Sequence, residues 1–135
     1  MRRTGEKIMG KKLNDNIEFC VTKELEEANK KFPAFNSTHE GYAVILEGAQ
    51  ETEDEMRCLA TDLNELWRRT KINAEGNKIK EVAAHMEDTA RRLAAEATQT
   101  AAMSRKLIQY IDSTTLKEAA ADGGQDAAQP VLQEA

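Results

Sequence analysis

The segment STHEGYAVILEGAQETEDEMRCLATDLNELWRRT, residues 37–70, carries an unbroken helical pattern of apolar side chains. Ser37 precedes the pattern as a predicted N-cap, and Glu40, three residues later, can return a hydrogen bond in a capping box. The apolar or small positions recur at steps of three and four, so they share one face of an α-helix of about 30 residues. They are Tyr42, Ile45, Ala49, Thr52, Met56, Leu59, Leu63, Leu66 and Thr70, with Trp67 beside them.

Two more helices are predicted, one on each side of this segment. The first covers residues 13–31 and ends before Pro33, because proline pushes the preceding residue out of the helical region. The last begins at Lys78, after the polar connection 73–77, and runs to about Ser113. Its stripe consists of Ile79, Val82, Met86, Thr89, Leu93, Glu96, Thr100, Met103, Leu107 and Tyr110.

The two ends of the chain are predicted to lie outside the helical domain, which covers residues 13–117. Residues 1–12 are predicted as a flexible N-terminal arm. Residues 118–135, rich in Ala, Gly, Gln and Asp, are predicted as a disordered tail, because they cannot bury enough apolar area to offset the entropy of ordering.

The composition favours helix and excludes several kinds of partner. The chain has 135 residues, of which 40% are apolar, 32% charged and only 4% aromatic. Its net charge of −5 disfavours binding to a nucleic-acid backbone. No apolar run approaches the ~20 residues of a membrane span, so we expect a cytoplasmic protein that does not enter a membrane.

The fold class predicted is all-α, with three main helices of which two are long. The stripes of the two long helices cannot both be buried within one monomer, because their far ends would project beyond the first helix. Self-association is therefore expected, as a homodimer or a dimer of dimers that shares a four-helix-bundle-type core.

Carboxylates at helical spacing are the candidate functional groups. Glu96 lies inside an apolar stripe, where a lone carboxylate would be costly to bury. It either meets an Arg or Lys of a neighbouring helix, escapes to solvent at an interface, or binds a metal ion. The row Glu47, Glu51, Asp54 and Glu55 follows one side of the middle helix. Alone it is typical of a solvated face, whereas facing Glu96 it would supply oxygen ligands that suit Mg²⁺ or Mn²⁺.

Residues 32–47, FPAFNSTHEGYAVILE, and 95–103, AEATQTAAM, resemble small phage-related and bacterial proteins of the MazG-like branch of the all-alpha nucleoside triphosphate pyrophosphatases. The resemblance extends over about residues 13–113. In that superfamily the motifs Glu-Glu-x-x-Glu and Glu-x-x-Asp on facing helices hold Mg²⁺, and water attacks the triphosphate to release pyrophosphate and a nucleoside monophosphate.

The resemblance implies that Glu47 and Glu51 are the first and last acids of the first motif and that Glu96 opens the second. Gly48 stands in place of the middle glutamate and Gln99 in place of the aspartate. Asp54 or Glu55, about one turn away, would then substitute as metal ligands.

The remaining roles follow from the chemistry of this reaction. Glu47 is the candidate base that accepts the proton of the attacking water. Candidate phosphate-binding groups are Arg91, Arg92 and Lys78, although such side chains commonly pair with acids on their own helix. Tyr42 and Trp67 would stack on the base or belong to the core.

The alternative function is a non-catalytic helical assembly or adaptor protein. In that case Glu96 would fix the register of the bundle through a buried ion pair.

Overall fold

The computed structural model describes residues 4–128, and side chains over 10–122, and it is built of three helices. They are α1 (Thr4–Lys31), α2 (Thr38–Lys71) and α3 (Gly76–Ala128), and no strand occurs among the residues described. The prediction of an all-α chain with three helices is confirmed. No part of the described helices has the length and apolarity needed to cross a membrane.

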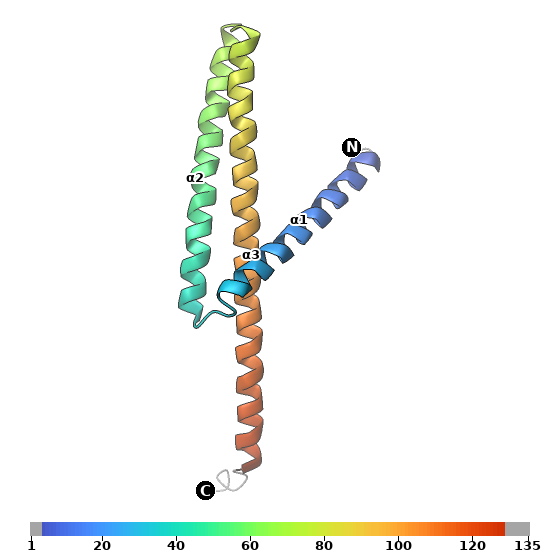
Figure 1. Ribbon diagram of the computed structural model, residues 1–135, viewed down its shortest axis with the longest axis vertical. Helices are drawn as coiled ribbons and strands as arrows, with labels where there is room; N and C mark the ends of the chain where they lie inside the picture. Colours follow the sequence, from blue (N-terminus) through green and yellow to red (C-terminus); the bar gives the residue numbers. More distant parts are fainter. Residues whose placement is uncertain (1–3, 129–135) are drawn as a thin grey trace.

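The two long helices form an antiparallel hairpin, and α1 crosses α3 near its middle (Figure 1). α1 packs against α3, its C-terminal end lies near the start of α2, and its N-terminal half diverges from the hairpin. α3 continues well beyond the start of α2, so its C-terminal part extends alone.

Both outer helices are longer than the sequence pattern predicted. α1 begins at Thr4 rather than Leu13, and α3 ends at Ala128 rather than near Ser113. The added segments contain good helix formers such as Lys and Ala and no proline, so a helix can continue there without an apolar stripe. Residues 1–3 of the predicted arm and 129–135 of the predicted tail lie outside the described residues.

Local hydrogen bonds set the ends of α2. The Ser37 side chain accepts from the Glu40 amide at 3.1 Å, while the Glu40 carboxylate accepts from the Asn36 amide at 2.9 Å. Glu40 therefore accepts from the amide of Asn36, one residue before the Ser37 amide that the capping box predicted. At the other end Asn73 adopts φ 51°, and the Ala74 amide donates to the Arg69 carbonyl at 3.0 Å. This is a Schellman-type stop, which turns the chain into α3.

The predicted stripe of α3 is confirmed, since all ten of its positions are buried or half-buried. The stripe of α2 is only half confirmed. Every second member faces α3, namely Ile45, Thr52, Leu59 and Leu66, whereas Tyr42, Ala49, Met56, Leu63 and Thr70 are exposed. Their places against α3 are taken by Gly41, Gly48, Glu55, Asp62 and Arg69.

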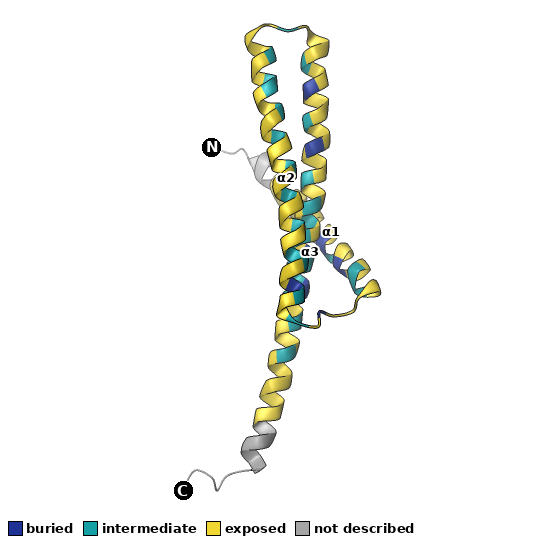
Figure 2. Ribbon diagram, turned by 90° about the vertical axis from the view of Figure 1, so that its left-hand side faces the viewer, coloured by how far each residue is buried: buried dark blue, intermediate teal, exposed yellow. Residues whose placement is uncertain are grey.

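Polar residues reach the interface between α2 and α3 because partners neutralise them there. Arg92 of α3 bonds to Glu55 at 3.1 Å, and the His85 ring lies 2.5 Å from Asp62. A pattern of apolar residues does not include such ion pairs, which explains why about half of the predicted α2 stripe lies on the exposed side of the helix. Figure 2 shows that buried positions are few on the hairpin.

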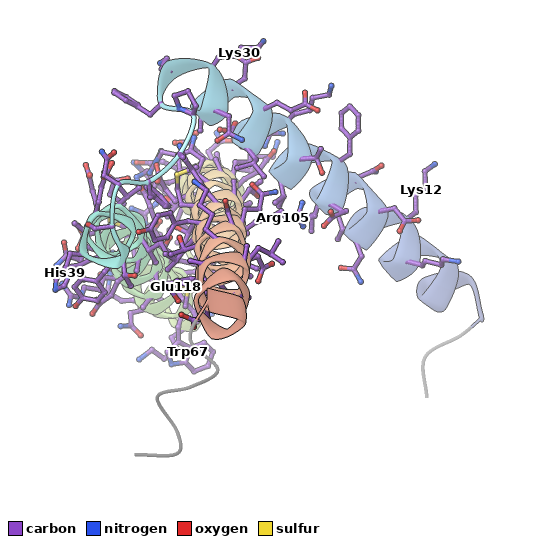
Figure 3. The ribbon with its side chains drawn as sticks, turned by 90° about the horizontal axis from the view of Figure 1, so that it is seen from below. Lys12, Lys30, His39, Trp67, Arg105 and Glu118 are labelled. Carbon is purple, nitrogen blue, oxygen red and sulfur yellow. The ribbon has the colours of Figure 1, made fainter. Side chains whose placement is uncertain are left out.

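α1 is held on α3 by a small apolar contact and by hydrogen bonds beside it. Val21 and Leu25 pack against Ala102, which is fully buried. Arg105 points toward α1 (Figure 3) and bonds to Glu18 at 2.7 Å, and the Lys106 ammonium donates to the Phe32 carbonyl at 2.5 Å.

Candidate functional site

At Gly48, α2 lies tightly against Thr100 of α3. A Cβ added to Gly48 would lie 2.6 Å from the Thr100 hydroxyl oxygen, closer than real side chains approach. The Thr100 hydroxyl donates to the Glu96 carbonyl at 2.8 Å, which fixes the side chain that occupies this space. A larger residue at position 48 would push the helices apart, so glycine brings the acids of the two helices together.

Glu51 of α2 and Glu96 of α3 meet beside this crossing. The hydrogen bond with Glu51 raises the pKa of Glu96, and partial desolvation and the charges of Glu51 and Glu55 raise it further. Glu47 lies on the wall of the same cavity, whose volume is about 220 Å³. The lining residues are Val44, Glu47, Gly48, Glu51, Glu96, Gln99, Thr100 and Met103.

The Glu51–Glu96 pair differs from the other acids between helices. Glu55 has Arg92, Asp62 has His85 and Glu18 has Arg105 as a basic partner. Within the described side chains, neither Glu51 nor Glu96 forms an ion pair. Two carboxylates held this close repel unless a proton or a cation lies between them.

The donor set suits a hard cation that also takes ligands from a substrate. Among the described side chains, no three His, Cys, Asp or Glu residues converge on one metal position. Mg²⁺ commonly uses only one or two carboxylates and completes its coordination with water and substrate phosphates. Glu51 and Glu96 therefore fit Mg²⁺ or Mn²⁺, and they do not make a closed structural site of the zinc type.

A larger cavity of about 510 Å³ adjoins the acidic one, between α1, the 32–37 connection and the hairpin. The two cavities share Val44, Gln99 and Met103 as walls. The larger one is lined further by Glu24, Glu27, Ala28, Lys31, Phe32, Phe35, Glu40 and Lys106. It combines aromatic rings, carboxylates and two ammonium groups next to the acidic pair.

The other predicted ligands and phosphate-binding groups have different surroundings. Asp54 is exposed and lies 3.6 Å from Arg57 of its own helix. Glu55 pairs with Arg92, so both Asp54 and Glu55 already have an arginine partner. Arg91, a predicted phosphate-binding group, pairs with Glu87 at 2.9 Å.

Lys78 lies at the tip of the hairpin. Its carbonyl accepts from Arg69, and it stands about 27 Å from Glu96 at 1.5 Å per residue along α3. The structure therefore brings Glu47, Glu51 and Glu96 together and does not bring Lys78 to them.

The predicted base-stacking residues do not lie around one cavity. Tyr42 is 63% exposed and Trp67 is 60% exposed. They are separated by about 37 Å along α2, and neither lines the two cavities described above. They cannot stack together on one base.

The structure identifies other candidates that the sequence pattern did not. Phe32, Phe35, Lys31 and Lys106 line the larger cavity, and the Lys106 ammonium lies 5.0 Å from the centre of the Phe35 ring. Lys106 is 5% exposed. The only signal in the sequence was the position of both phenylalanines beside the proline turn, since the burial of Lys106 depends on where α1 docks.

No protein-family model, curated protein or solved structure matches this chain. The resemblance to MazG-like proteins stays a prediction.

Proposed function

We propose that this chain is a divalent-cation-dependent nucleoside triphosphate pyrophosphohydrolase of MazG-like type, or a degenerate relative of one, which converts an NTP or dNTP to the monophosphate and pyrophosphate. The observation that supports the proposal is the Glu51–Glu96 pair, which has no basic partner among the described residues and shares a cavity with Glu47. A nucleotide substrate agrees with the cytoplasmic location expected from the sequence.

The two adjoining cavities match the two ends of such a substrate. Its triphosphate would lie at the acidic cavity, with the ion held by Glu51 and Glu96. Its nucleoside would enter the larger cavity, beside Phe32 and Phe35. Lys31 would neutralise phosphate charge from the α1 side, and the Gln99 amide at the shared wall can donate to a phosphate oxygen.

Each acid has a distinct role in this scheme. Bound Mg²⁺ would neutralise the phosphates and acidify a water molecule. Glu47, exposed on the wall of the cavity, would accept the proton of that water. No protein nucleophile is required.

We also propose that copies of the chain associate into a four-helix-bundle-type core. Large apolar side chains on the hairpin support this part of the proposal, since Met56, Leu63 and Trp67 are each more than half exposed. An exposed apolar row of this kind is characteristic of an interface.

The decisive experiment measures pyrophosphate release from a panel of NTPs and dNTPs with Mg²⁺ or Mn²⁺. The wild type should release pyrophosphate, and Glu96→Gln should lose at least 100-fold in rate. The matched control is Glu87→Gln, an exposed acid of the same helix that pairs with Arg91. This control should keep the wild-type rate.

Thermal unfolding provides an independent readout of the cation. Mg²⁺ should raise the melting temperature of the wild type and of Glu87→Gln but not that of Glu96→Gln or Glu51→Gln, because a ligand that binds only the folded state stabilises it.

A non-catalytic assembly or adaptor protein is the second candidate. It is favoured by Gly48 and Gln99 at positions where the resembled motifs carry acids, and by the pairing of Arg91 and Arg92 with acids outside the cavity. Absence of pyrophosphate release from every substrate, together with no effect of Mg²⁺ on unfolding, would contradict the enzyme and support the adaptor.

A further inference from the structure

The exposed side of α2 carries a second apolar row, distinct from the side that packs on α3. Tyr42, Leu46, Met56, Leu63 and Trp67 are 63%, 38%, 51%, 56% and 60% exposed. Trp67 lies on the side of the hairpin away from α1 (Figure 3). With Ala49, Glu53 and Ala60 these residues recur at alternating steps of four and three, the spacing of a coiled-coil seam. We call these eight residues the outer row.

The outer row has nearly the same order of residue types from either end. Positions at equal distances on the two sides of the point between Asp54 and Glu55 carry two aromatic residues, two leucines, two alanines, and a glutamate with a methionine. The pairs are Tyr42 with Trp67, Leu46 with Leu63, Ala49 with Ala60, and Glu53 with Met56. An antiparallel two-fold contact brings mirror positions together, so large residues would meet large ones and small residues small ones.

Charge also favours the antiparallel arrangement. In a parallel pair in register, Glu53 would face its own copy, which is repulsive. In the antiparallel pair Glu53 faces Met56 of the second copy and lies next to Arg57 of the second copy. Within one chain Glu53 already bonds to Arg57 at 2.7 Å, with both side chains exposed. Two such pairs would meet at the centre of the interface.

The end of the outer row offers a receiving surface. A shallow cavity of about 380 Å³ lies beside Trp67, lined by Leu63, Asn64, Leu66, Trp67 and Thr70. In the antiparallel register Tyr42 of the second copy would reach this cavity. None of the outer row lines either cavity of the candidate site, so both stay accessible.

We propose that a second copy of this chain docks antiparallel along α2, through the outer row, with its two-fold axis between residues 54 and 55. The inference rests on the proposed self-association, which it refines by naming the surface and the register. It does not depend on catalysis.

Cysteine cross-linking tests the register. The exposed Cys20 and Cys58 are first replaced by serine. Copies with Leu46→Cys, mixed with copies with Leu63→Cys, should form a disulfide-linked heterodimer, because these positions face each other only in the antiparallel pair. Either variant alone should give no covalent dimer. Covalent dimers from each single variant would indicate a parallel pair and overturn the proposal.

Sedimentation tests the surface. The wild type should sediment as a dimer or a larger assembly, and Met56→Glu should shift it to a monomer with unchanged helix content. The matched control is Ile108→Glu, on an exposed residue of α3 (60% exposed), which should remain associated. A monomeric wild type would contradict self-association altogether. Loss of association in both variants, or in neither, would show that the outer row is not the interface, while self-association itself would stand.

Discussion

Glu96 is the residue at which sequence and structure converge. Its position within the stripe of α3 indicated a side chain turned toward α2, and the structure brings it to Glu51. An acid in this position weakens the packing of the apoprotein unless it is protonated or holds a cation. A destabilising group retained between helices is typical of a binding site.

Glu96→Gln should therefore stabilise the protein at neutral pH without divalent ions. A carboxyl whose pKa is raised in the folded state favours folding below its ordinary pKa of 4.5, and that contribution is lost as the pH rises through the raised value. The wild type should thus melt at a progressively lower temperature relative to the variant between pH 4 and 7. At pH 7 the variant should melt a few degrees higher.

Circular dichroism melts across this pH range, with EDTA present, make the comparison. Glu87→Gln should follow the wild type, since Glu87 is exposed and paired with Arg91. A lower melting temperature for Glu96→Gln at pH 7 would contradict the repulsion inferred between Glu51 and Glu96.

At the scale of elements, α2 and α3 differ in how clearly their patterns can be read. α3 has one apolar stripe, and all of it is buried or half-buried, with Met103 packed against the cluster that α1 forms with α3. α2 has two rows that share its apolar residues, one against α3 and one exposed. The row against α3 contains the charged residues Glu55 and Asp62. A prediction based on apolar residues alone therefore replaced them with members of the outer row.

Gly48→Ala tests the helix crossing. The new methyl group would meet the Thr100 hydroxyl at 2.6 Å, which costs about 1–3 kcal/mol through overpacking, offset by up to ~1 kcal/mol from removal of a glycine within a helix. We expect a net loss of about 1–2 kcal/mol in the free energy of unfolding, measured by urea denaturation.

The double variant Gly48→Ala with Thr100→Ala should recover most of this loss. It removes the hydroxyl and leaves the position 100 Cβ at 3.6 Å, an ordinary contact. If the two substitutions are simply additive, the close approach at Gly48 is not what limits the helix spacing.

At the scale of the whole molecule, α1 docks through a small surface. Its buried residues Val21 and Leu25 meet Ala102, while Leu13, Ile17 and Phe19 remain exposed on its outer part. The attachment matters for function because α1 supplies one wall of the larger cavity.

Ala102→Leu should detach α1 and leave the hairpin folded. Ala102 is fully buried between α1 and α3, and a larger side chain there costs about 1–3 kcal/mol, against a docking surface of only a few residues. Hydrogen exchange of the amides over residues 18–31 should accelerate, whereas that of 79–93 should not change.

Ala101→Leu is the matched control, because position 101 is exposed. Equal exchange in Ala102→Leu and the wild type would show that α1 is held elsewhere. A parallel rise over residues 79–93 would show that the three helices unfold together.

The sequence by itself determined the three helices, the cap at Ser37, the inward stripe of α3 and the position of Glu96. These follow from local periodicity, capping chemistry and proline geometry, which act within a few residues along the chain. Only the tertiary structure decided which row of α2 faces α3, that Glu51 meets Glu96 while Lys78 lies far away, and that Phe32 and Lys106 form a cavity with α1. Those outcomes depend on ion pairs between helices and on the direction in which α1 leaves the turn. Neither feature produces a periodic pattern of residue types in a single sequence.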